Sequence, residues 1–115
     1  MNYSIIPTPQ FEKDLKHLHK KYPLIKKDIA ILEKLLNDNP TTGIPLKRGC
    51  YKIRMKITGK SSGKSGGARI ITHVKVVNQK VYLLRMYDKS ELDDLAEGEL
   101  DDLINNTITV YKIAQ

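Results

Sequence analysis

The sequence is poor in several residue types, and each shortage excludes a class of protein. A single cysteine, Cys50, among 115 residues cannot close an internal disulfide. The three histidines (His17, His19 and His73) do not have the spacing of a zinc site. No apolar run approaches the roughly 20 residues of a membrane-spanning helix, and the N-terminal stretch lacks the plan of a signal peptide. We therefore expect a protein of the reducing cytoplasm, with no membrane partner, metal or cofactor.

Acidic residues are also missing from one long stretch, since none occurs from Asn39 to Tyr87. The bases in this stretch are Lys47, Arg48, Lys52, Arg54, Lys56, Lys60, Lys64, Arg69, Lys75, Lys80 and Arg85. Residues 1–87 hold 18 of the 20 bases and five of the 13 acids, a net charge of +13, whereas the remainder carries −6. Such an uneven charge favours a polyanionic partner.

The same stretch has the alternation of strands with one apolar and one basic face. Residues 50–57 and 68–77 each alternate in this way, and residues 81–87 are expected to place Tyr82, Leu84 and Met86 on one face and Val81, Leu83, Arg85 and Tyr87 on the other. Pairing like faces predicts a basic face made of Lys52, Arg54, Lys56, Arg69, His73, Arg85 and Tyr87. We call this set the predicted basic face.

The flanking segments predict helices and one further strand. Residues 3–6 form a short strand, and Thr8 caps a helix over 9–20 that has Pro9 at its first position. A second helix runs from Leu24 or Ile25 to Leu36, and the short connection predicts an antiparallel helical hairpin. Residues 40–49 are expected to be a loop, and residues 58–67, with four glycines, a mobile loop. Ser90 caps a short turn, and a last helix covers 97–111.

These elements predict one α+β domain over residues 1–115. Its core is a four-stranded, mostly antiparallel sheet packed on the N-terminal helical hairpin, with a C-terminal helix. The acidic stretch 88–102 is interpreted as a solvated helix start, with contact to a partner or to the chain itself as the alternative.

Three segments in this order resemble a known family. They are C-Y-K-I-R-M at 50–55, G-K-S-G-G-A-R-I-I at 63–71 and V-Y-L-L-R-M-Y-D-K-S-E-L-D-D-L at 81–95. Together they resemble the RelE/ParE superfamily of toxins from bacterial type II toxin–antitoxin modules, and the HigB-like branch most closely. The resemblance covers roughly residues 3–95.

The resemblance implies a small, metal-independent ribonuclease that cuts messenger RNA on the ribosome, stops translation and is neutralised by an antitoxin. The antitoxin would be a helix-turn-helix protein encoded next to it. Lys52 and Arg54 match the basic pair of the family's second strand, Arg69 matches the arginine of the next strand, and Lys89 and Glu91 match a K-x-E motif. Ser90 stands where the RelE branch has a catalytic arginine, and the C-terminal tyrosine of that branch has no clear counterpart. Arg85 and Tyr87 are the candidates to substitute for these two residues in space.

Metal-free RNA cleavage needs removal of the 2′-OH proton, stabilisation of the phosphorane and protonation of the leaving 5′-oxygen. Arg54 and Arg69 suit the phosphorane, because guanidinium stays charged and binds phosphate through two hydrogen bonds. Lysines among other cations lose their protons more readily, so Lys52 or Lys56 are candidates for base or acid, with Tyr87 or His73 as alternatives. Predicted RNA contacts are Lys47, Arg48, Lys60, Lys64, His73, Arg85 and Lys89.

Two other functions stay open at this point. A ParE-like toxin of the same superfamily would inhibit DNA gyrase without cleaving RNA. A non-catalytic RNA-binding protein would use the same basic face without a catalytic group. Fold alone does not separate these functions, because they depend on the residues of the site.

Overall fold

The computed structural model describes residues 2–61, 63 and 66–113, in eight helices and strands. In chain order they are β1 (Ser4–Pro7), α1 (Pro9–Lys21), α2 (Ile25–Asp38), β2 (Ile44–Pro45), β3 (Cys50–Met55), β4 (Ala68–Lys75), β5 (Lys80–Asp88) and α3 (Glu99–Tyr111). The α+β class and the helices predicted from the sequence are confirmed, with ends shifted by one or two residues.

The sheet is mixed and has five strands in the order β1-β5-β4-β3-β2. The N-terminal strand β1 runs parallel to β5, and the other neighbours are antiparallel. The prediction of four strands is wrong by one, because Ile44 and Pro45 in the predicted loop pair with Lys52 and Tyr51. This pairing covers only the first half of the outer edge of β3.

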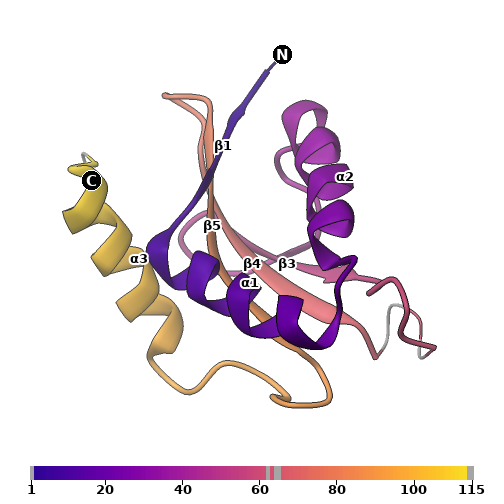
Figure 1. Cartoon of the computed structure of the whole chain (residues 1–115). Coiled ribbons are helices and arrows are strands. Elements are labelled where there is room, and N and C mark those ends of the chain that lie inside the picture. Colours follow the sequence, from indigo (N-terminus) through magenta and orange to yellow (C-terminus); the bar gives the residue numbers. More distant parts are fainter. Residues whose placement is uncertain (1, 62, 64–65, 114–115) are drawn as a thin grey trace.

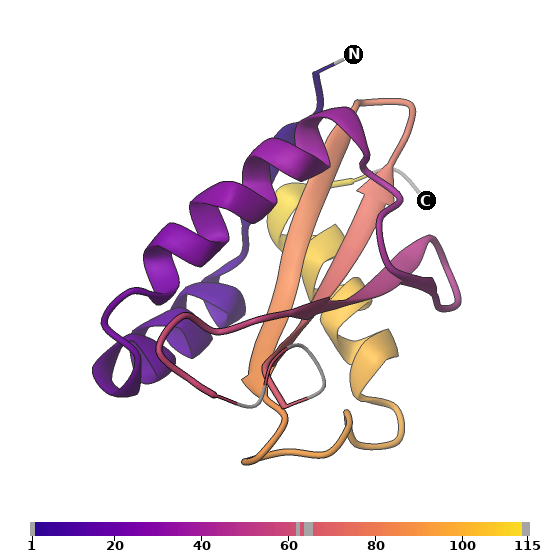
Figure 2. The same cartoon turned by 90° about the vertical axis from the view of Figure 1, so that its right-hand side faces the viewer.

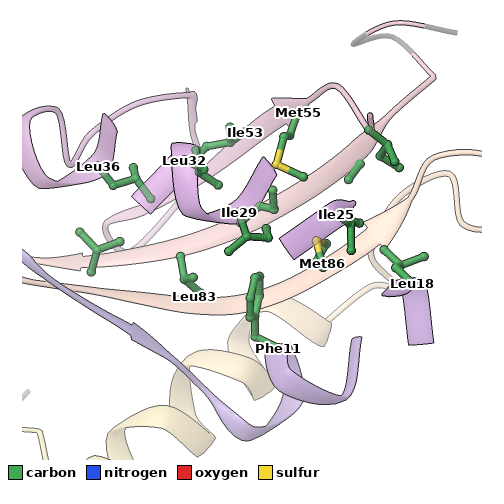
Figure 3. Close-up of a cluster of buried hydrophobic side chains, with 14 of the residues drawn as sticks. Phe11, Leu18, Ile25, Ile29, Leu32, Leu36, Ile53, Met55, Leu83 and Met86 are labelled. Atoms are coloured by element: carbon green, nitrogen blue, oxygen red, sulfur yellow. The ribbon is translucent and has the colours of Figure 1, made fainter. Parts of the chain in front are cut away.

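One face of the sheet is covered by α1 and α2. The Thr8 hydroxyl accepts a hydrogen bond from the backbone N–H of Phe11 at 3.3 Å, so it caps α1 as predicted. Apolar residues of both helices, from Phe11 to Leu36, pack on Ile53, Met55, Leu83 and Met86 of the strands (Figure 3). The two helices are steeply inclined to each other, not antiparallel as predicted (Figures 1 and 2), because each packs mainly on the twisted sheet.

A bulge interrupts the alternation of β5. Ile71 pairs with Arg85 whereas the next residue, Thr72, pairs with Leu83, which leaves Leu84 as the extra residue. Met86 therefore joins Val81 and Leu83 on the face covered by α1 and α2, and Tyr82, Leu84 and Tyr87 face the other way. The predicted alternation of this strand is wrong after Leu84, because an inserted residue reverses the side chains that follow it.

The other face of the sheet carries a second core. There Cys50, Ile71, Tyr82, Leu84 and Tyr87 pack beneath Ile104 of α3. Figure 1 shows α3 on the side of the sheet opposite α2, and the chain reaches it through the irregular segment after β5. The predicted basic face is therefore not an open face, since apolar residues of α3 and of this segment cover much of it.

The segment between β5 and α3 forms no helix of its own. The N–H groups of Glu91 and Leu92 donate to the backbone carbonyl of Asp88, and the Ser90 hydroxyl donates to the Asp88 carboxylate at 2.7 Å. The predicted cap at Ser90 is thus corrected: Asp88 is the acceptor that organises this turn. Within the described residues, no helix has both the length and the apolar character needed to cross a membrane.

Candidate nucleic-acid interface

The sheet register places the central candidates in one row across three strands. Arg54 of β3 lies opposite Arg69 of β4, and Arg69 lies opposite Tyr87 of β5. Directly opposed residues carry their side chains on the same face, with Cβ atoms about 4.5–5.5 Å apart. Lys52 shares this face two residues along β3, where it opposes Ile71. The row brings two guanidinium groups, an amine and a phenol to one end of the sheet.

Two members of the row are almost closed to solvent. Arg69 is 5% exposed and Tyr87 4% exposed. Burial raises the pKa of the Tyr87 phenol to about 12, assisted by the nearby Asp94 carboxylate, while Arg69 and Arg85 oppose the shift. The phenol is therefore protonated at neutral pH and is suited to donate a proton, not to remove one.

Lys52 and Tyr87 meet at a carboxylate that the sequence did not single out. The Asp94 Oδ1 atom lies 3.2 Å from the Lys52 amine and accepts a hydrogen bond from the Tyr87 hydroxyl at 3.4 Å. A hydrogen bond from the backbone of Leu95, followed by the one from Lys52, lowers the pKa of Asp94. An ionised aspartate thus occupies the position between the two candidate proton carriers.

Arg54 and Lys56 are exposed. Lys56 follows the last residue of β3 and, with Arg54, lines a groove whose apolar wall is formed by Ile31 and Leu35 of α2. Both α2 side chains are exposed, Ile31 at 69% and Leu35 at 44%. This groove runs along the part of β3 that β2 does not cover.

Five of the predicted RNA contacts are paired with acids of the same chain. The Lys47 amine lies 2.7 Å and the Arg48 guanidinium 3.1 Å from Asp101 of α3. The Lys60 amine lies 2.6 Å from Asp88. Close ion pairs also join Lys89 to Asp93 and Arg85 to Glu99. A sixth predicted contact, Lys64, lies outside the described residues.

The remaining predicted contact, His73, is 4% exposed and lies beside Cys50 and Tyr82 of the second core. Its Nδ1 atom lies 3.4 Å from the Cys50 sulfur. Burial, followed by the charges of Lys75 and Arg48, lowers the pKa of His73, so the ring is neutral at pH 7. Burial also raises the pKa of the Cys50 thiol to about 12, which leaves it without nucleophilic thiolate. RNA does not reach His73 while the second core is intact.

Gly67 precedes the Ala68–Arg69 pair for a structural reason. A Cβ atom at this position would lie 2.2 Å from the Met55 carbonyl oxygen on the neighbouring strand. The glycine is therefore required by the close approach of the β3 backbone.

Asp88 is a second acid that sequence reasoning missed. Its side chain is fully buried and accepts hydrogen bonds from the Lys60 amine at 2.6 Å, the Tyr22 hydroxyl at 2.7 Å and the Ser90 backbone N–H at 2.9 Å. Although burial raises its pKa, these hydrogen bonds outweigh that effect and hold the pKa well below its usual range. Asp88 thereby ties the end of β5 to α1 and to the loop after β3.

Comparisons with known proteins agree with this architecture. No protein-family model matches the chain. Free RelE toxin from E. coli, in a double arginine-to-alanine mutant, superimposes with a TM-score of 0.56 at 17% identity, over 81% of this chain and 90% of that one. The toxin–antitoxin complex RelBE2 from Mycobacterium tuberculosis contains a chain that matches with a TM-score of 0.57 at 22% identity, over 76% of this chain and 99% of that one. The chain therefore has the RelE-like α+β fold, with three helices and a five-stranded mixed sheet.

Proposed function

We propose that the protein is the toxin of a type II toxin–antitoxin module and acts as a ribosome-dependent mRNA endoribonuclease of the HigB-like branch. The observation that carries this proposal is the row formed by Arg54, Arg69 and Tyr87, with Lys52 on the same face, in a RelE-like fold. A phosphate bound across this row would meet two guanidinium groups from one side and a protonated phenol from the other.

In the proposed reaction the ribose 2′-oxygen attacks the adjacent phosphorus, and the bond from phosphorus to the 5′-oxygen breaks. Arg54 and Arg69 stabilise the charge that develops on the non-bridging oxygens. Tyr87 donates its proton to the leaving 5′-oxygen, because its phenol is protonated at neutral pH. Lys52, once it has left its ion pair with Asp94 and lost its own proton to solvent, is the candidate that accepts the proton of the 2′-hydroxyl. Lys56, exposed beside Arg54, binds substrate phosphate.

The proposed partner is an antitoxin with acidic and apolar side chains. The groove between α2 and β3 offers Ile31 and Leu35 as apolar contacts and Arg54 and Lys56 as charges. Beside it, β3 extends beyond the two residues that pair with β2. An antitoxin segment that adds a strand at this edge would place apolar side chains in the groove and carboxylates on the two bases.

The test is cleavage of messenger RNA bound to ribosomes by purified protein and by its Arg69→Ala and Arg54→Ala variants. Arg54 is exposed, so its replacement tests the site even if loss of the buried Arg69 side chain impairs folding. Lys27→Ala is the matched control, because it removes one exposed positive charge from α2, on the other side of the sheet. We expect loss of cleavage in both arginine variants and wild-type cleavage in the control. Full activity in a folded Arg54→Ala protein would refute the assignment.

A further inference from the structure

The acidic segment, defined as residues 88–102, supplies nearly all ion pairs of the described structure. Of the nine ion pairs found among the described residues, eight take their carboxylate from Asp88, Glu91, Asp93, Asp94, Glu99 or Asp101. The exception is the pair between Arg85 and Asp14. Residues 88–115 carry a net charge of −6, and their carboxylates thus form ion pairs with the bases of the same chain.

Six of the eight bases held in this way are those assigned to RNA or to catalysis, and the other two are His17 and Lys21 of α1. Asp94 forms an ion pair with Lys52 and accepts a hydrogen bond from Tyr87, both of which are assigned to catalysis. Asp101 forms ion pairs with Lys47 and Arg48, which are assigned to RNA binding. Leu92 and Leu95 pack against the second core that contains Tyr87. A phenol that protonates a leaving group has to touch the substrate, yet Tyr87 is only 4% exposed beneath this cover.

The middle of the acidic segment is held weakly. Residues 89–98 contain no helix or strand, and Leu92 and Leu95 are only partly buried. The carboxylate of Asp94 is 61% exposed and that of Glu91 is 35% exposed, so their ion pairs are screened by solvent and salt. An RNA strand carries a phosphate at every nucleotide and can replace several such carboxylates at once.

We propose that residues 91–95 are an intramolecular competitor of RNA, which closes Lys52 and Tyr87 in the free protein and is displaced when phosphates pair with the same bases. This inference rests on the proposed function, since it takes RNA to be the ligand of the face. Three features occur together at this place. The Asp94 carboxylate contacts the candidate proton carriers Lys52 and Tyr87, Tyr87 is buried, and the residues 91–95 that cover it have no regular secondary structure.

The first test compares two single-charge variants. Asp94→Asn removes the carboxylate that holds Lys52 and Tyr87, whereas Asp38→Asn removes an exposed charge at the end of α2, away from the face. Affinity for a fluorescently labelled single-stranded RNA is measured by anisotropy at one salt concentration. We expect Asp94→Asn to tighten binding several-fold and Asp38→Asn to change it little. Equal effects of the two variants would overturn the proposal.

The second test separates displacement from local charge. Leu92→Ala combined with Leu95→Ala loosens the cover without changing any charge, and Leu46→Ala is its control, because Leu46 packs on the same core from the loop between β2 and β3. We expect the double variant to bind the labelled RNA more tightly than wild type and the control to bind as wild type does. Unchanged or weaker binding by a folded double variant would overturn the proposal.

Failure of the competitor proposal and failure of the proposed function are distinguishable. If the RNA affinities follow the expected order while ribosome-bound message stays intact, the face binds RNA and the nuclease assignment is wrong. If message is cleaved while the affinities of all variants agree, the nuclease assignment holds and the competitor proposal is wrong. Absence of RNA binding in every variant, the loosened one included, contradicts the competitor proposal outright.

Discussion

Replacement of Lys60 by alanine should destabilise the fold, although the sequence marks Lys60 as an RNA contact on a mobile loop. Its amine lies 2.6 Å from the Asp88 carboxylate, and its side chain is only 18% exposed. The same amine lies 5.9 Å from the centre of the Tyr22 ring. Lys60→Ala would leave Asp88, which is fully buried, without its only cationic partner among the described residues.

The expected cost follows from the partners that remain. Breaking a buried ion pair typically costs about 3–5 kcal/mol, because it leaves an uncompensated buried charge. Asp88 would keep its hydrogen bonds from Tyr22 and Ser90, each worth about 1.5–3 kcal/mol to a charged acceptor. Water could also reach the space of the partly exposed lysine. We therefore expect a loss at or just below the lower end of the range for a buried ion pair, about 2–3 kcal/mol of unfolding free energy at pH 7.

The dependence on pH gives the prediction a second signature. The pKa of Asp88 is lowered in the folded protein, so its ionisation stabilises the fold above the ordinary aspartate pKa of about 4. That contribution is lost as the pH falls below 4 toward the folded value. The difference between wild type and Lys60→Ala should therefore be complete at pH 7 and shrink below about pH 4.

The assay is urea unfolding at pH 7 and at several values below pH 5. Lys56→Ala is the matched control, because this exposed lysine should change the unfolding free energy by no more than about 0.5 kcal/mol. Stability within that margin for Lys60→Ala would refute the role of Asp88, and so would a difference that grows as the pH falls.

Further predictions concern the site. Arg69→Ala should lower cleavage about 100- to 1,000-fold, and Arg69→Lys should restore only part, because lysine cannot form the paired contact; single-turnover cleavage measures both. Tyr87→Phe should lower the rate of the chemical step about 100-fold or more, and wild-type activity should show no loss through Tyr87 ionisation between pH 6 and 9, since its pKa is about 12. Lys64→Ala should weaken RNA binding mildly and in a salt-dependent manner, as anisotropy titrations would show. Antitoxin affinity should fall as salt rises, and a salt-independent complex away from the basic region would contradict the charge argument.

Much of the fold was predictable because it depends on local patterns. Helix spacing, the cap at Thr8 and the alternation of β3 and β4 all follow from residues close in sequence. That Arg54 and Arg69 share a face also follows from the alternation of the two strands, whereas their direct opposition depends on a register that the long connection between β3 and β4 does not determine.

The rest depends on contacts between residues far apart in sequence. The bulge at Leu84 gives no local signal, yet it exchanges the faces of Met86 and Tyr87. Asp94 meets Lys52 across 42 residues and Asp101 meets Lys47 across 54, and the sequence shows only that opposite charges are available. The burial of His73 beside Cys50 and Tyr82 likewise follows from tertiary packing, which composition does not determine.

The most direct test of the proposed function is to map the 5′ ends of messenger RNA after inducing the protein alone in cells. The nuclease proposal predicts growth arrest, halted translation and new 5′ ends within the codons of translated messages, all abolished in a folded Arg54→Ala variant. Intact messages with a DNA-damage response would contradict it in favour of a gyrase inhibitor. Unarrested growth with intact messages would contradict it in favour of a non-catalytic RNA-binding protein.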